Sequence, residues 1–154
     1  MLERCKPNLP KGTAEQAPNT GNRSDLYFNA ENSIAMTVEQ VATRLVNYCR
    51  HEQFSLAHKE LYADDAVSIE PFEVPGFEKE TRGLSALAEK DKKFNAMVES
   101  RYGTTVSEPL IAGNAFSFVL TMDIKLKGRD REQLTELCVY TVKDGRIISE
   151  QFFM

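Results

Sequence analysis

The most regular feature of the chain is an alternation of large apolar side chains with smaller or polar ones between Phe116 and Leu126. A period of two residues is typical of a β-strand that buries one face. Two further extended runs follow, 133–142 and 146–153, and the turn at 143–145 between them predicts a hairpin. The end of the chain is therefore predicted to be antiparallel sheet.

Earlier in the chain, apolar positions recur every three or four residues, which predicts helices. The first helix is expected over 37–52 and opens with the capping-box pair Thr37 and Gln40. A second, short helix is expected to end at Asp64-Asp65, and a third to run over 84–100. Most helices therefore precede most strands.

Two shorter strands complete the prediction. Residues 66–72 are expected to be extended, and so are residues 102–111, with a bend at Pro109. Helices first and antiparallel strands last is the pattern of an α+β domain, so the fold class is predicted to be α+β.

The first 36 residues differ from the rest because they show no sustained period and are rich in Pro, Gly, Asn, Ser and charge. We expect 1–36 to be a disordered or loosely docked tail, with Leu26, Tyr27 and Phe28 as the segment that could dock. One domain is expected over 37–154. The start of the chain lacks the apolar stretch of a secretory signal.

Composition narrows the possible partners and the compartment. The chain has 154 residues and a net charge of −4. It offers no basic field for a phosphate backbone or an anionic lipid surface, so we expect neither nucleic acid nor membrane as a partner. Its three cysteines are widely spaced, which favours a reducing compartment. Without a long apolar run, the protein is expected to be cytoplasmic.

Motifs for metals and cofactors are missing from the sequence. It contains no CxxC pair, no HExxH pattern and no Gly-rich phosphate loop, so we expect no metal and no cofactor. His51 and His58 lie at predicted helix ends among polar residues and are expected at the surface. Cys49 and Cys138 are expected to be buried thiols.

Three segments carry a family resemblance. The run LYADDAVSIEP resembles the segment that leads into the first strand of ketosteroid isomerases. The strand AFSFVLTMDIKLKG and the hairpin VYTVKDGRIISEQFF look like the wider nuclear-transport-factor-2-like superfamily, to which SnoaL-like polyketide cyclases belong. The resemblance covers 37–154. It implies a cone-shaped, curved antiparallel sheet wrapped around the N-terminal helices, with an internal pocket.

The resemblance also assigns positions in the pocket. The isomerase general base falls on Glu70, and the protonated Asp of its oxyanion hole falls near Glu136 or Cys138. The catalytic Tyr falls on Val46, so it is missing here, and the nearest aromatic is Tyr48. The isomerase pattern of a base beside an oxyanion hole made of a Tyr and a protonated Asp is thus only partly kept.

The late acid of SnoaL-like cyclases falls on Phe152, beside Glu150. Two points of geometry stay open. A type I turn with Gly145 in the left-handed position would place Cys138 opposite Glu150, and we favour it; a two-residue turn at Asp144-Gly145 would shift the pairing by one residue. For Glu70, the period of the strand points it away from the core, whereas the resemblance points it inward.

Two functions follow from these candidates. The first is a binding module for a small apolar molecule. The second is an isomerase- or cyclase-like enzyme with Glu70 as general base, whose pKa burial would raise. Alternatively, each Glu lies on a solvated rim or pairs with a Lys or Arg. The candidate catalytic residues are Glu70, Glu136, Glu150 and Tyr140. The candidate ligand-binding residues are Tyr48, Tyr62, Phe72, Phe118, Met122, Cys138 and Phe152.

The outer face of the curved sheet is also predicted to be apolar. A wide exposed apolar face is usually covered by a partner, so we expect a homodimer that pairs through this face. The residues expected on it are Val119, Thr121, Leu137, Val139 and Ile147.

Overall fold

The helix expected at the start of the domain is α1, Val38–Arg50, in a computed structural model that describes residues 35–73 and 75–154. Its capping box is formed: the Thr37 hydroxyl accepts from the backbone N–H of Gln40, and the Gln40 side chain accepts from the backbone N–H of Thr37. The expected docking of Leu26, Tyr27 and Phe28 concerns residues outside this description.

The second helix is shorter than expected. Helix α2, Phe54–Leu61, ends before Asp64-Asp65, and the chain passes directly into strand β1, Tyr62–Ile69. The two aspartates are exposed residues of that strand and not a helix end. The expectation that they end the helix was wrong. Exposed positions of a strand keep both carboxylates in solvent as well as a helix end would.

The segment after β1 holds one unpredicted strand. Strand β2, Glu80–Arg82, pairs antiparallel with β1. Helix α3 is Leu84–Met97, and strand β3 begins at Val98, so the helix is shorter than the 84–100 expected. A three-residue strand such as β2 carries too few positions for a period of two to be visible.

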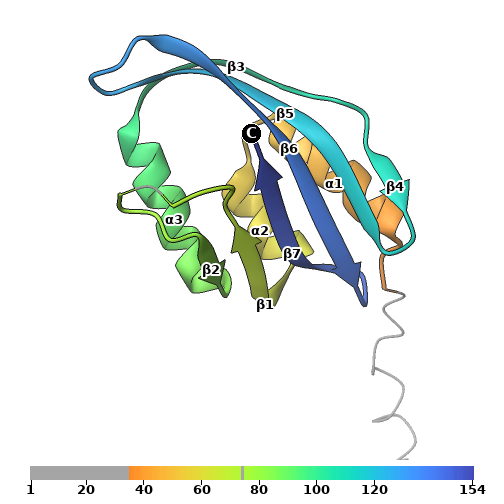
Figure 1. Ribbon diagram of the computed structural model, residues 1–154. Helices are drawn as coiled ribbons and strands as arrows, with labels where there is room; N and C mark the ends of the chain where they lie inside the picture. Colours follow the sequence, from red (N-terminus) through yellow and green to blue (C-terminus); the bar gives the residue numbers. More distant parts are fainter. Residues whose placement is uncertain (1–34, 74) are drawn as a thin grey trace, which may run out of the picture. The chain divides into compact units, whose positions relative to one another are not determined.

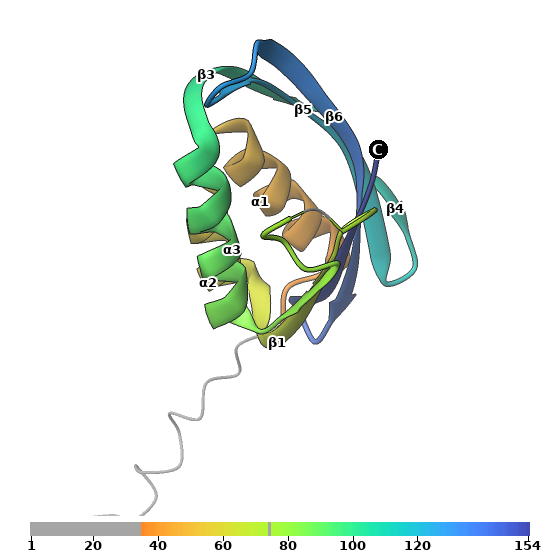
Figure 2. The ribbon, with the colours of Figure 1, turned by 60° about the vertical axis from the view of Figure 1, so that its left-hand side comes forward.

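The remaining strands confirm the predicted α+β cone. They are β4 (Leu110–Ala112), β5 (Ala115–Leu126), β6 (Arg131–Lys143) and β7 (Arg146–Phe153). The seven-stranded sheet has the order β2-β1-β7-β6-β5-β3, with β4 also pairing with β5. All pairs are antiparallel except β1 with β7, which is parallel. Figures 1 and 2 show the sheet curving over the three helices, which lie on its concave side.

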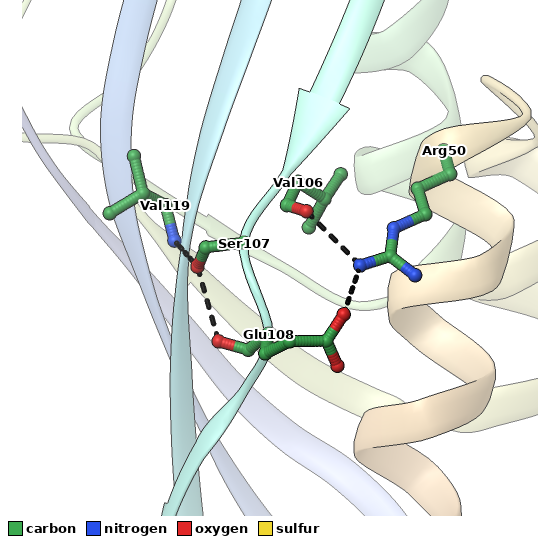
Figure 3. A network of polar contacts seen from close by, with 5 residues as sticks. All are labelled: Arg50, Val106, Ser107, Glu108 and Val119. Atoms are coloured by element: carbon green, nitrogen blue, oxygen red, sulfur yellow. Dashed lines mark hydrogen bonds and ion pairs between the residues drawn. The ribbon is translucent and has the colours of Figure 1, made fainter.

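The predicted bend at Pro109 is a complete break between β3, Val98–Val106, and β4. Ser107 continues the ladder across the break, because its N–H donates to the Val119 carbonyl and its hydroxyl accepts from the Val119 N–H, each at 3.0 Å. Arg50 of α1 donates to the Val106 carbonyl at 3.2 Å and to Glu108 at 2.7 Å (Figure 3). The end of β3 is thereby tied to the end of α1.

The β6–β7 turn differs from the one we favoured. Asp144 and Gly145 have φ of 51° and 74° and form a two-residue turn in which Lys143 pairs with Arg146. A Cβ on Gly145 would also lie 2.6 Å from the backbone nitrogen of Met36. The favoured type I turn was therefore wrong.

A bulge then changes the register of the hairpin. Val142 pairs with Ile147, but Tyr140 pairs with Glu150, so one residue of β7 is inserted between these pairs. Cys138 consequently lies opposite Phe152 and not opposite Glu150. The bulge still leaves Glu150 and Phe152 on the face of Tyr140, as the favoured pairing required. The two-residue turn pairs Ile147 with the buried Val142 and so turns it inward, where its side chain is fully buried, so its expected place on the outer face was wrong.

Candidate functional site

A cavity of about 630 Å³ lies between the helices and the concave face of the sheet. Most of its wall is apolar, and the aliphatic part comes from α1, α3, β5 and β6. A cavity of this size lined mainly by apolar side chains is typical of a small-molecule site. Its aliphatic lining residues include Leu45, Leu87, Leu120, Met122, Leu126 and Leu134.

The buried carboxylate of this cavity is Glu150 on β7, with 5% of its surface exposed. It accepts a hydrogen bond of 2.5 Å from the hydroxyl of Tyr62. The parallel pairing of β1 with β7 brings these two residues together. Burial, followed by the charge of Glu150 and this hydrogen bond, raises the pKa of Tyr62 well above its ordinary value.

Glu136 on β6 lines the same wall and is the acid with the most perturbed titration. Burial raises its pKa from 4.5 to about 7, and the negative charges of Glu70 and Glu150 add to the rise. The Cys138 thiol lies 3.7 Å from its carboxylate and acts in the opposite direction, as does the more distant Lys90. A carboxyl group with such a pKa exchanges its proton near neutral pH.

Glu70 lines the cavity too, as the family resemblance implied, but it forms an ion pair with Lys90 of α3. The Lys90 ammonium also donates to the Ser68 hydroxyl at 2.7 Å. Ser68 is fully buried, so the strand period that turned Ser68 and Glu70 away from the core was misleading. Of the alternatives for Glu70, pairing with a Lys is the one observed. Its role as general base stays a prediction.

His58 is half-buried in the cavity wall, so its expected place at the surface was wrong. Its Nδ1 lies 3.1 Å from Oδ2 of Asp91 on α3, and its ring meets that of Tyr62 edge-on at 4.6 Å between centroids. The sequence did carry a signal for this placement. Phe54, His58 and Leu61 are spaced four and three residues apart, which puts them on one helix face.

Most of the remaining candidates line the cavity. Tyr62, Met122, Tyr140 and Phe152 do so, and Phe72 lines it while 55% exposed. Burial raises the pKa of Tyr140 well above its ordinary value.

Three predicted ligand-binding residues are not part of the cavity lining. Tyr48 is partly buried beside the core, and its hydroxyl donates a hydrogen bond to Glu60 at the surface. Phe118 is buried with its ring against Tyr140, at 5.2 Å between centroids. Cys138 is fully buried, and burial raises the pKa of its thiol, with the Glu136 charge adding to the rise. As expected, Cys49 and Cys138 are free, buried thiols.

Neither a metal-binding cluster nor a membrane-spanning helix is found in the described part of the chain. Residues 35–73 and 75–154 contain no group of three or more His, Cys, Asp or Glu side chains placed to hold a metal ion. In the same residues, no helix has the length and apolar character needed to cross a membrane.

Comparison with solved structures supports the fold. A protein of Mesorhizobium loti, provisionally assigned as a SnoaL-like polyketide cyclase, is 27% identical with a TM-score of 0.71, over 77% of this chain and 100% of its own. A cystatin-like protein of Xanthomonas campestris is 13% identical with a TM-score of 0.66, over 77% of this chain and 90% of its own.

A third similar structure is a protein of Catenulispora acidiphila with a ketosteroid isomerase-like fold, solved with trimethylamine. It is 14% identical with a TM-score of 0.60, over 77% of this chain and 87% of its own. A search among curated proteins gives no match. The SnoaL-like domain model matches residues 36–154, and together with the observed fold this match shows that the chain belongs to the SnoaL-like domain family.

Proposed function

We propose that this chain binds a small, mostly apolar molecule in the cavity. The observation that carries the proposal is the cavity itself, about 630 Å³ with a mainly aliphatic and aromatic wall that also holds several charged side chains. Cavities of roughly 300–1,000 Å³ with this kind of lining bind most of the small ligands known in proteins.

Binding can be tested with 2-tetralone, a bicyclic ketone, as the probe. Met122→Trp would fill the cavity from β5, whereas Val119→Trp alters the same strand on its outer face, where Val119 is 41% exposed. We expect NMR titration to show probe binding by the wild type and by Val119→Trp, and a loss of at least about tenfold in Met122→Trp. If Met122→Trp and Val119→Trp are both folded and bind the probe equally well, the proposal is contradicted.

A second candidate function is proton transfer, in the manner of an isomerase or a cyclase. The observation that favours it is Glu136, whose pKa of about 7 suits a group that both accepts and releases a proton at neutral pH. Glu136 therefore replaces Glu70 as the favoured base, since Glu70 is held by Lys90.

The chemical step would be the removal of a proton from a carbon next to a carbonyl. A Glu136 carboxylate oxygen takes the proton, and the electron pair of the broken C–H bond moves into the carbonyl to give an enolate. Return of the proton to another carbon gives an isomer. Attack of the enolate carbon on a second carbonyl closes a ring. The apolar lining assists because it keeps competing water away.

Exchange of the α-protons of 2-tetralone for deuterium in D₂O measures this step without knowledge of the substrate. We expect the wild type to accelerate exchange and Glu136→Gln to lose roughly 10²-fold or more of that acceleration. Glu108→Gln is the control, because the Glu108 side chain is 84% exposed. If Glu70→Gln abolishes exchange and Glu136→Gln does not, Glu70 is the base.

We also propose that two copies of the chain pair through the outer face of the sheet. Val119 and Leu137 lie opposite each other in the β5–β6 register, and each is 41% exposed. Thr121 and Thr135 follow on the same face and share a hydrogen bond of 2.9 Å. Light scattering at micromolar concentration should give twice the chain mass, and Leu137→Asp should reduce it to one; a monomeric wild type would contradict the pairing.

A further inference from the structure

The contact between His58 and Asp91 joins two helices at the cavity wall. His58 comes from α2 and Asp91 from α3, and 15% and 25% of their side-chain surfaces are exposed. Both residues line the cavity. The two atoms in contact, Nδ1 of His58 and Oδ2 of Asp91, are shielded from solvent; they make no hydrogen bond within the described residues, so their contact is an ion pair. Because both residues line the cavity while these two atoms are buried, other atoms of the two side chains face the cavity.

This arrangement fixes which imidazole nitrogen can serve a bound molecule. An imidazole whose Nδ1–H donates to a carboxylate has its lone pair on Nε2, and on protonation Nε2 becomes a donor. The edge of the His58 ring against Tyr62, with 79° between the ring planes, restrains its rotation further. His51, the only other histidine of the chain, is exposed and lies 2.8 Å from the Asn47 carbonyl.

Charged groups surround His58 on several elements. Burial lowers the pKa of His58, but the contact with Asp91 and the negative charges of Glu150 and Asp91 outweigh it, and the net shift is upward from 6.5. Lys90 acts in the opposite direction. The upward shift favours the imidazolium form, and Glu136, which lines the same cavity, exchanges its proton near neutral pH.

We propose that His58 and Asp91 form a second proton-carrying pair of the cavity, in which Asp91 orients the ring and Nε2 of His58 donates to a carbonyl oxygen of the bound molecule. This inference rests on the proposed function and assigns the substrate class: an apolar molecule that carries a ketone or similar carbonyl. As the Glu136 carboxylate removes the carbon-bound proton, the electron pair moves to the carbonyl oxygen. The Nε2–H of His58 passes to that oxygen, which leaves a neutral imidazole, a protonated Glu136 and an enol. Reversal of both transfers restores the two side chains.

The two histidines of the chain make the test direct. His51→Gln leaves His58 as the only imidazole, and ¹⁵N NMR of that full-length variant reports its tautomer and titration. We expect the neutral ring to carry its proton on Nδ1. In Asp91→Asn the titration midpoint of His58 should move to lower pH, because the Asp91 charge no longer offsets the effect of burial on the His58 pKa. Asp91→Glu should restore the midpoint in part. A neutral ring protonated on Nε2 would overturn the proposal.

Deuterium exchange of 2-tetralone separates this pair from a merely structural contact. We expect His58→Gln to lose roughly 10²-fold of the acceleration, Asp91→Asn to move the pH profile of the exchange rate to lower pH, and His51→Gln to change neither. One result would overturn the role of His58 and leave Glu136 in place. In it, a folded His58→Gln variant exchanges as fast as the wild type, and the double variant His58→Gln with Glu136→Gln loses the acceleration.

A wild type that does not accelerate exchange would instead contradict the proton-transfer function. In that case the ¹⁵N signal of Nε2 decides the matter. A shift of that signal on addition of 2-tetralone supports His58 as a carbonyl-binding group, and binding of the probe without a shift overturns it.

Discussion

Two walls of the cavity carry carboxylates in contrasting surroundings. On the β1 side, Glu70 is held by the ammonium of Lys90, which also binds Ser68. On the β6–β7 side, Glu136 and Glu150 face a hydroxyl and a thiol, and within the described residues neither takes part in an ion pair. The same residue type thus pairs with a cation on one wall, whereas on the other Glu136 has a pKa raised to about 7. A nearby cation, and not the carboxylate itself, decides which role is available.

The largest effect expected from this contrast is in the pH dependence of stability. Because the pKa of Glu136 is raised in the folded chain, to about 7 from 4.5, the folded state binds this proton more tightly than the unfolded state. The stabilisation is fully present below about pH 4.5 and is lost as the pH rises through about 7. Glu136→Gln should therefore match the wild type near pH 4.5 and be more stable at pH 8, by up to about 3 kcal/mol.

Urea unfolding at both pH values measures this difference. The exposed variant Glu108→Gln should show a small difference at both. A gain in Glu136→Gln that is equal at pH 4.5 and pH 8 would mean that the substitution acts through packing, and that Glu136 is not a buried acid.

On the opposite wall, Lys90→Met should destabilise the chain because it leaves Glu70 without its partner. The two side chains are 17% and 24% exposed. The expected loss is therefore about 2 kcal/mol, below the roughly 3–5 kcal/mol for a fully buried pair. Lys92→Met is the matched control, since Lys92 pairs with Glu89 at the surface, and its effect should stay within about 0.5 kcal/mol.

The double variant Lys90→Met with Glu70→Gln sharpens this prediction. Much of the lost stability should return, because the uncompensated charge has been removed along with the cation. If the double variant is no more stable than Lys90→Met alone, the interaction that matters is the hydrogen bond of Lys90 to Ser68.

Two tyrosine variants compare a buried with an exposed hydrogen bond to a glutamate. Tyr62→Phe removes the donor to the buried Glu150 and should cost roughly 1.5–2 kcal/mol of stability. Tyr48→Phe removes the donor to Glu60 at the surface and should cost less than about 0.5 kcal/mol. Thermal or urea unfolding of the two variants tests this, and equal costs would mean that Glu150 is satisfied by other groups.

Local patterns in the sequence were enough to predict the α+β class, whereas the cone-shaped sheet was implied by the family resemblance. The capping box of Thr37 and Gln40 depends on residues three apart, and the alternation along β5 depends on neighbours two apart. The β6–β7 register depended on more. The two-residue turn brings Ile147 opposite the buried Val142, and the bulge then returns Glu150 to the face of Tyr140. Two irregularities that cancel each other leave no regular signal in the sequence.

The site was harder to predict because its chemistry depends on residues distant in the chain. Glu70 directly follows β1 and Lys90 lies on α3, and no spacing in the sequence indicates that they are in contact. The same is true of Asp91, whose position beside His58 depends on how α2 and α3 pack. The family resemblance led to Glu70, Glu136 and Glu150 as cavity residues, but it did not indicate which of them pairs with a cation.

The smallest effect is expected at Phe72, which the sequence analysis placed among the candidate ligand-binding residues. Phe72 and Phe153 are 55% and 46% exposed, so Phe72→Ala and Phe153→Ala should each change stability by no more than about 0.5 kcal/mol. Only Phe72 lines the cavity. Phe72→Ala should therefore weaken 2-tetralone binding a few-fold, by roughly 0.5–1 kcal/mol of lost apolar contact, while Phe153→Ala leaves it unchanged. Equal probe affinity in both variants would place the bound molecule deeper, against the Glu136 wall, and would remove the mouth of the cavity from the binding site.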